Sequence, residues 1–167
     1  MTSFYRDVVG SAAWDALPRV LHDLHERGGD GTLTVTAGGV AGVLSFLGYA
    51  PSRGSAPVTL RIETLPDGER WVRRFHDEVF ATEQRPVRGL VAERFGIIEM
   101  LFKVAARADS LRYEPVDIRL CIGRARLTVP TWMRPRMEAS ERADGPRVAV
   151  NVSIGKSFRY TGYITPR

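Results

Sequence analysis

The sequence predicts a mainly β protein, an antiparallel up-and-down barrel or strongly curved half-barrel of about ten strands with helices at its N-terminus. From residue 57 onward, short segments of alternating apolar and polar residues follow one another, separated by turn-forming residues. Turns such as PDGE at 66–69 join neighbouring segments as hairpins, which makes an antiparallel meander. Because a sheet of this size curls and closure removes its exposed edges, we expect a barrel wide enough to hold a ligand.

The segment 3–27 is predicted to be helical. Its apolar stripe consists of Trp14, Leu17, Leu21 and Leu24. Pro18 marks the first turn of a second helical segment, and Gly28 and Gly29 end that segment. One domain spans 1–167, with a helical part at 1–30 and the strand meander at 57–167.

Between these two parts, we expect a strand at 32–37, a short buried helix at 38–47 and a loop at 49–56. Strands of the meander are expected near 58–62, 70–76, 79–83, 88–96, 97–106, 111–120, 136–141, 147–154 and 158–165. The stretch 88–106 forms either two strands or one strand bent at Gly96. Residues 122–135 are less regular, so a short strand followed by a loop is expected there.

Composition and charge exclude several classes of protein. No run of about 18 apolar residues occurs, so we expect no membrane-spanning helix and no membrane partner. The N-terminus lacks the apolar stretch of an export signal, and the single cysteine, Cys121, allows no internal disulfide, so a cytoplasmic location is expected. The net charge is +5, but the arginines are scattered and no nucleic-acid motif occurs, so we expect no nucleic-acid partner.

The sequence lacks the motifs of metal and nucleophile chemistry. His22 and His25 have helical spacing, but neither a third ligand nor a cysteine pair accompanies them, so no metal is expected. Cys121 follows an apolar strand, as a packed core thiol does. No GxSxG or GxGxxG occurs, and we expect no cofactor. Acid–base chemistry by carboxylates, with or without histidine, remains.

The strand at 88–96 supplies the leading candidate. Val91, Glu93 and Phe95 share one face of it because strand side chains alternate. If that face looks into an enclosed space, desolvation raises the pKa of Glu93 and makes it a proton donor. The alternative is that Glu93 is ion-paired or lies at a solvated rim. In the strand at 70–76, Arg74 shares a face with Val72 and His76, where it could supply a fixed positive charge.

Five other carboxylates lie on predicted strands: Glu63, Glu99, Glu114, Asp117 and Glu138. Glu63 and Glu114 lie beside arginines and look solvated, and Glu99 shares its face with Lys103. Glu138 lies with Arg136, which indicates either an outer row of ion pairs or a polar cluster inside the barrel.

Five motifs together resemble a bacterial family known only as a domain of unknown function. They are FYRDVVG at 4–10, LPRVLHDLH at 17–25, ERWVRRF at 69–75, LVAERFG at 90–96 and FRYTGYI at 158–164. Nearly the whole chain is covered, in that order. The chain also resembles the spiroacetal cyclases of oligomycin-type polyketide pathways. The GRARLTVP stretch at 123–130 departs from the GIPLP-like version expected in the wider family.

The resemblance implies a ten-stranded barrel whose cavity holds a few polar residues that act as general acids and bases. Carried over to the matching motifs, it implies that Glu93, Arg74 and His22 are catalytic. As substrate-binding residues we expect Trp71, Phe95, Arg136, Glu138 and Tyr160.

The function expected on this basis is a cofactor-independent spiroacetal cyclase in polyketide antibiotic biosynthesis. A dihydroxy-ketone would close to a hemiacetal, lose water with the help of a general acid, and be attacked by its second hydroxyl while a base removes the proton. The alternative is a carrier or binding protein for an apolar polyketide-like ligand, which would use the same barrel without a titrating carboxylate.

Overall fold

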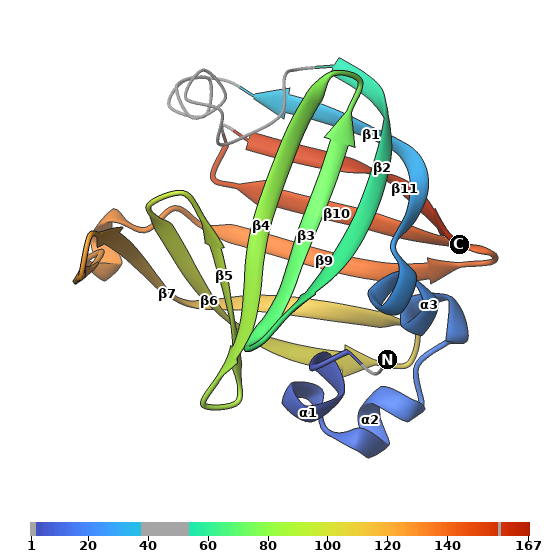
Figure 1. Ribbon diagram of the computed structural model, residues 1–167, viewed down its shortest axis with the longest axis horizontal. Helices are drawn as coiled ribbons and strands as arrows, with labels where there is room; N and C mark the ends of the chain where they lie inside the picture. The colour runs from blue at the N-terminus through green and yellow to red at the C-terminus, as the bar shows by residue number, and fades with distance from the viewer. Residues whose placement is uncertain (1–2, 38–53, 157) are drawn as a thin grey trace.

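The computed structural model describes residues 3–37, 54–156 and 158–167, and it confirms the predicted mainly β fold (Figure 1). The helices are α1 (Tyr5–Val9), α2 (Ser11–Asp15), α3 (Arg19–Arg27) and the short 3-10 helix η1 (Thr131–Met133). The first strands are β1 (Gly29–Ala37), β2 (Gly54–Leu65), β3 (Gly68–Phe75), β4 (Glu78–Val87), β5 (Leu90–Phe95) and β6 (Ile98–Arg107). The remaining strands are β7 (Ser110–Ile122), β8 (Ala125–Thr128), β9 (Met137–Asp144), β10 (Arg147–Ile154) and β11 (Phe158–Pro166).

Ten of the eleven strands close into an antiparallel barrel. Each strand from β1 to β7 pairs with the next, β7 also pairs with β9, and β11 returns to pair with β1. In the described part of the chain, β8 pairs only with the far end of β7, so it extends one hairpin beyond the barrel wall. Closure leaves the barrel strands without free edges, and this removal of unpaired edges is why a barrel was expected from the sequence.

The predicted N-terminal helix is three short helices. Gly10 separates α1 from α2 with a φ of +92°, a backbone conformation that glycine adopts without steric cost. Pro18 occupies the N-cap of α3, next to the predicted first-turn position. The apolar stripe holds across these breaks: the side chains of Trp14, Leu17, Leu21 and Leu24 are all buried.

The three helices cover one end of the barrel (Figure 1). Helix α3 contacts β2, β9, β10 and β11, whereas α1 and α2 contact β5 and β6. The residues without accessible surface include Tyr5, Leu21, Leu24, Leu60, Leu111 and Val148. Burial of a leucine of this kind stabilises the fold by roughly 1.5–3 kcal/mol. The three helices therefore cover this end of the barrel with a closely packed apolar layer.

The structure settles several details of the meander. Residues 88–106 form two strands, β5 and β6, because the chain turns at Gly96 with a φ of +57°. Residues 54–56, predicted as part of a loop, are the start of β2, where they pair with β1. The predicted helix at 38–47 and the loop residues 49–53 lie outside the described residues. No helix in the described part of the chain has the length and apolar character needed to cross a bilayer.

Candidate functional site

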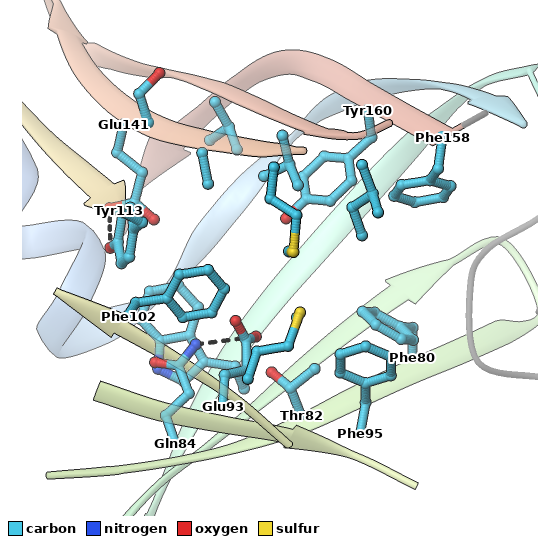
Figure 2. Close-up of a pocket in the computed structure, with 18 of the residues that line it drawn as sticks. Phe80, Thr82, Gln84, Glu93, Phe95, Phe102, Tyr113, Glu141, Phe158 and Tyr160 are labelled. Atoms are coloured by element: carbon cyan, nitrogen blue, oxygen red, sulfur yellow. Dashed lines mark hydrogen bonds between the residues drawn. The ribbon is translucent and has the colours of Figure 1, made fainter. Parts of the chain in front are cut away.

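A cavity of about 440 Å³ fills the barrel between the helices and the opposite end. Its lining consists of an apolar wall and a set of polar residues, here called the polar floor; in Figure 2, Glu93 and Gln84 point into the cavity from one side and Glu141 and Tyr160 from the other. The apolar wall is formed by Phe80, Phe95, Met100, Phe102, Met133, Met137, Val150, Val152, Ile154 and Phe158. The polar residues are Tyr5, Arg73, Thr82, Gln84, Glu93, Tyr113, Glu141 and Tyr160. Such a combination of apolar lining and a few converging polar groups is typical of a small-molecule site.

Glu93 lies on β5 and points into the cavity (Figure 2). Its Oε1 atom accepts a hydrogen bond from the side-chain amide of Gln84 at 3.2 Å. Gln84 faces Glu93 directly in the β4–β5 register, so the two strands hold this contact. Among the described residues, Oε2 of Glu93 has no hydrogen-bond partner, and 20 % of the side chain is exposed. One carboxylate oxygen is therefore held in place while the other is free to meet a ligand.

Arg73 on β3 provides the cation nearest to this carboxylate. Its Nη2 atom lies 3.9 Å from Oε1 of Glu93, and its Nη1 atom donates a hydrogen bond to Oγ1 of Thr82 at 3.2 Å. The guanidinium also lies over the rings of Trp71 and Phe80. These contacts hold a positive charge beside Glu93 at the edge of the apolar chamber.

Helix α1 contributes Tyr5 to the floor. The Tyr5 hydroxyl donates a hydrogen bond to Oε1 of Gln84 at 2.8 Å, which orients the amide so that its nitrogen faces Glu93. The preceding Ser3 donates to Glu69 at 2.7 Å, and Trp71 donates to the other oxygen of Glu69 at 3.0 Å. The N-terminal segment is thus hydrogen-bonded into the same network as the catalytic candidate.

A second carboxylate, Glu141 on β9, lies on another side of the cavity. Its Oε2 atom is 2.6 Å from Nε2 of His25 and accepts a hydrogen bond from the Tyr113 hydroxyl at 3.1 Å. His25 comes from α3 and is itself fully buried. His25 and Tyr113 hold Glu141 through Oε2, and its side chain is 11 % exposed against 20 % for Glu93, so Glu93 is the more accessible of the two cavity carboxylates.

Three tyrosines of the cavity remain protonated across the physiological range. Burial raises the pKa of Tyr5 and of Tyr113 well above the usual value, and the nearby Glu141 carboxylate adds to both shifts. Burial likewise raises the pKa of Tyr160 to about 12. Each hydroxyl can therefore donate a hydrogen bond to a ligand or a neighbour at neutral pH.

Four of the predicted site residues line the cavity: Trp71, Glu93, Phe95 and Tyr160. Glu93 and Phe95 share one face of β5, as alternation predicted, and the structure places that face toward the cavity, which the sequence left open. The proposed alternatives for Glu93 both hold in part, because it lies near an arginine and inside a chamber at the same time.

Arg74 is not in the site. It is exposed on the outer wall of β3, and its neighbour Arg73 faces the cavity, because the inward face of this strand carries Glu69, Trp71, Arg73 and Phe75. Alternation separates the two faces of a strand but does not say which one points inward.

His22 also lies outside the cavity lining. Its Nε2 atom donates a hydrogen bond to the Trp14 carbonyl at 2.8 Å, and its ring stacks on the Trp14 ring. It joins α2 to α3 and has a packing role.

Arg136 and Glu138 form an ion pair of 3.1 Å on the outside of the barrel, with side chains 87 % and 61 % exposed. Of the two alternatives for this pair, the outer row is correct, and the expected contact with substrate is wrong.

Other carboxylates occupy structural positions. Glu63 and Glu114 are exposed, as predicted. Glu99 is buried and lies 2.6 Å from Arg85, and Asp117 is ion-paired with Arg119 and Arg134. In the described residues, no group of three or more histidine, cysteine, aspartate or glutamate side chains is placed to hold a metal ion.

Six of the polar residues of the cavity were not predicted from the sequence: Tyr5, Arg73, Thr82, Gln84, Tyr113 and Glu141. A signal existed for Glu141, which shares a strand face with Met137 and Ala139 at i, i+2 spacing. For Gln84 and Tyr113 the signal was weak, because their position depends on which strands meet across the barrel.

The profile of one protein family, the domain of unknown function DUF4166, matches residues 17–164. No curated protein and no solved structure shows significant similarity to the chain. The match covers β1 to β10, most of β11 and most of the cavity lining. The chain therefore belongs to the DUF4166 family.

Proposed function

We propose that this DUF4166 protein is a cofactor-independent spiroacetal cyclase of polyketide antibiotic biosynthesis, which closes a dihydroxy-ketone by general acid–base catalysis inside the barrel. The observation that supports it is the arrangement of Glu93, with one oxygen held by Gln84 and the other facing an apolar chamber. A flexible apolar chain fits the wall, and its carbonyl and hydroxyl groups meet the polar floor.

The acid step begins from a hemiacetal formed when one hydroxyl of the substrate attacks the ketone. Protonated on Oε2, Glu93 donates its proton to the hemiacetal hydroxyl, which leaves as water. The C–O bond electrons depart with that water, so an oxocarbenium ion remains beside the Glu93 carboxylate. Arg73 at 3.9 Å and the Gln84 amide at 3.2 Å stabilise the carboxylate at this stage.

The base step restores the enzyme. The second hydroxyl of the substrate attacks the oxocarbenium carbon and loses its proton to Glu93, which returns to its starting state with the spiroacetal formed. One carboxyl group thus serves as acid and then as base. Proton transfer of this kind typically accelerates a reaction by ~10²–10⁴-fold. The cavity increases the rate further by holding the substrate in a conformation in which the hydroxyl and the carbonyl carbon are close together.

The test is turnover of an open dihydroxy-ketone by Glu93→Gln, which keeps the shape but removes the titrating group. We expect a loss of about 10²- to 10⁴-fold in kcat. Glu138→Gln is the matched control, because that carboxylate is exposed on the outer wall. Turnover by Glu93→Gln that equals the wild type would remove Glu93 from the mechanism and with it the proposal.

The same cavity supports a second function, a carrier for an apolar ligand, because its wall is apolar over most of its length. Native mass spectrometry of the gently purified protein distinguishes the two. A ligand that co-purifies unchanged and binds Glu93→Gln as tightly as the wild type would favour the carrier. Conversion of an added open precursor favours the cyclase.

A further inference from the structure

The excess positive charge of this protein lies in one stretch of chain. Lysine and arginine number 24 and aspartate and glutamate 19. Residues 118–137 contain five arginines and no acidic residue, which leaves 19 basic and 19 acidic residues elsewhere. The five are Arg119, Arg124, Arg126, Arg134 and Arg136. The rest of the chain is therefore electrically balanced, and this stretch carries the net charge.

Two of these arginines are free to meet a partner. Arg119 and Arg134 are ion-paired with Asp117, and Arg136 with Glu138. Arg124, in the β7–β8 turn, and Arg126, on β8, are exposed and have no ion-pair partner among the described residues.

The same stretch exposes apolar side chains. Trp132 on η1 is 83 % exposed, and Ile122, Leu127 and Met133 are each more than half exposed. In the β7–β8 ladder Ile122 lies opposite Ala125 and Leu127 opposite Leu120, so Ile122 and Leu127 share one face of the hairpin. Arg126 lies opposite Cys121, so it is on the other face of the same hairpin. We call the tip of this hairpin and η1, with the exposed side chains of Ile122, Arg124, Arg126, Leu127, Trp132 and Met133, the mouth ridge.

The mouth ridge is held in a fixed shape and adjoins the cavity. The guanidinium of Arg134 donates hydrogen bonds to the carbonyls of Val129 at 2.8 Å and Val116 at 2.9 Å, which ties the end of η1 to β7. Met133 and the neighbouring Pro135 belong to the cavity lining. An apolar surface thus continues from the outside of the protein into the chamber, beside β7 in Figure 1.

We propose that the mouth ridge docks the protein on an anionic lipid surface, so that apolar molecules dissolved in the lipid can reach the cavity. The exposed side chains match the layers of such a surface. The arginines would contact the lipid phosphates, the aliphatic side chains would enter the hydrocarbon, and the indole ring of the tryptophan would lie at the boundary between them. Docking at a surface requires no spanning helix, so the absence of one from the sequence does not bear on it. The proposal does not depend on the reaction that the cavity carries out.

Other occupants fit less well. A second copy of this chain would bring two sets of unpaired arginines together, and like charges repel. A nucleic acid offers phosphates but no apolar interior for Ile122 and Leu127. An acidic protein is distinguished by the experiment below, because it would leave the ridge without affinity for lipid.

The experiment is flotation of the full chain with vesicles of phosphatidylcholine alone and of equimolar phosphatidylcholine and phosphatidylglycerol. We expect binding to the anionic vesicles, weakened by salt. Tryptophan emission gives a local readout, because Trp14 and Trp71 are 2 % exposed and only Trp132, of the three tryptophans, meets solvent. The emission is expected to shift to shorter wavelength on binding, and Trp132→Ala is expected to remove the shift.

Two charge reversals distinguish the ridge from general electrostatics. The ridge variant combines Arg124→Glu with Arg126→Glu. The control variant combines Arg61→Glu with Arg74→Glu, two positions exposed on the outer wall. Each double variant lowers the net charge from +5 to +1. We expect the ridge pair to lose at least about tenfold in vesicle affinity and the control pair to stay within about twofold. No binding to anionic vesicles, equal losses in both pairs, or bound protein with unshifted Trp132 emission would each overturn the proposal.

Discussion

His25 is a buried residue that holds one of the polar residues of the cavity, Glu141, in place. Its Nε2 atom lies 2.6 Å from Glu141, and its Nδ1 atom is buried with no hydrogen-bond partner among the described residues. A hydrogen on Nδ1 would be left without an acceptor, so the geometry places a hydrogen on Nε2, which donates it to Glu141. The ring packs edge-on against Tyr5 and Trp71, so the pair with Glu141 is enclosed by aromatic groups.

His25→Ala is expected to destabilise the protein by about 3 kcal/mol, because it opens a cavity and leaves Glu141 without its closest partner. His76→Asn is the control, since His76 is exposed in a turn with a φ of +47°, which asparagine tolerates. Urea unfolding of both variants checks the difference in the free energy of unfolding. A loss below about 1 kcal/mol in His25→Ala would show that the pair is not an anchor.

At the same scale, the sequence predicted the site in part. Alternation placed Glu93 and Phe95 together correctly, because the apolar neighbours of Glu93 indicated an enclosed face. It could not separate Arg73 from Arg74, since both lie on strand faces that carry apolar residues. Glu141 was not among the predicted candidates, although it shares its strand face with the apolar Met137 and Ala139, the same pattern that indicated Glu93.

Among the elements, the β1–β11 seam has the tightest packing. A methyl group at Gly31 would lie 1.9 Å from the Tyr163 carbonyl oxygen, and one at Gly162 would lie 2.0 Å from the Thr32 carbonyl oxygen. Arg167, just after β11, also forms a 2.8 Å ion pair with Asp30 on β1. The seam joins the last strand to the first, so the closure of the barrel depends on these close approaches.

Gly31→Ala is expected to lower the free energy of unfolding by about 1–3 kcal/mol, because backbone atoms of β11 would have to move. Thr165→Ala, at an exposed position of the same ladder, is expected to change it by less than about 0.5 kcal/mol. Thermal unfolding measures both. If the two variants unfold together, the seam tolerates a side chain and its glycines have no packing role.

Most elements could be predicted because hairpin turns and alternation are local signals. PDGE at 66–69 is the β2–β3 turn, and the alternation at 147–154 coincides with β10. The break in the N-terminal helix was missed at Gly10, since the apolar stripe continues across it and periodicity alone does not register a glycine conformation.

For the molecule as a whole, the buried tyrosines predict how stability depends on pH. Burial raises the pKa of Tyr160 to about 12 and the pKa values of Tyr5 and Tyr113 well above the unfolded value of about 10. Above pH 10 the unfolded chain loses these protons while the folded barrel keeps them. Stability is therefore complete below about pH 10 and falls as pH rises toward about 12.

Urea unfolding between about pH 8 and pH 11 measures this fall. Tyr160→Phe removes one of the three groups, so its stability is expected to fall less steeply than that of the wild type over the same range. Identical slopes for the two proteins would mean that Tyr160 ionises inside the folded barrel.

The number of strands predicted from the sequence was enough to predict that the barrel closes. It was not enough to predict which residues face one another across the cavity. Glu93 on β5 and Glu141 on β9 face one cavity because β7 pairs with both β6 and β9, with β8 and η1 looped out between. No local pattern encodes that long-range register.

The N-terminal helices cover one end of the barrel (Figure 1), and Tyr5 of α1 lines the cavity from that side. A molecule longer than the bore is wide cannot turn around inside, so the end that goes in first is the end that stays deepest. Because the wall is apolar and the depth is polar, an oxygen-bearing end must lead and a hydrocarbon end must trail. Under the function proposed above, the orientation of the substrate would therefore be set as it enters the cavity, before the reaction, and the product would leave with its hydrocarbon end first.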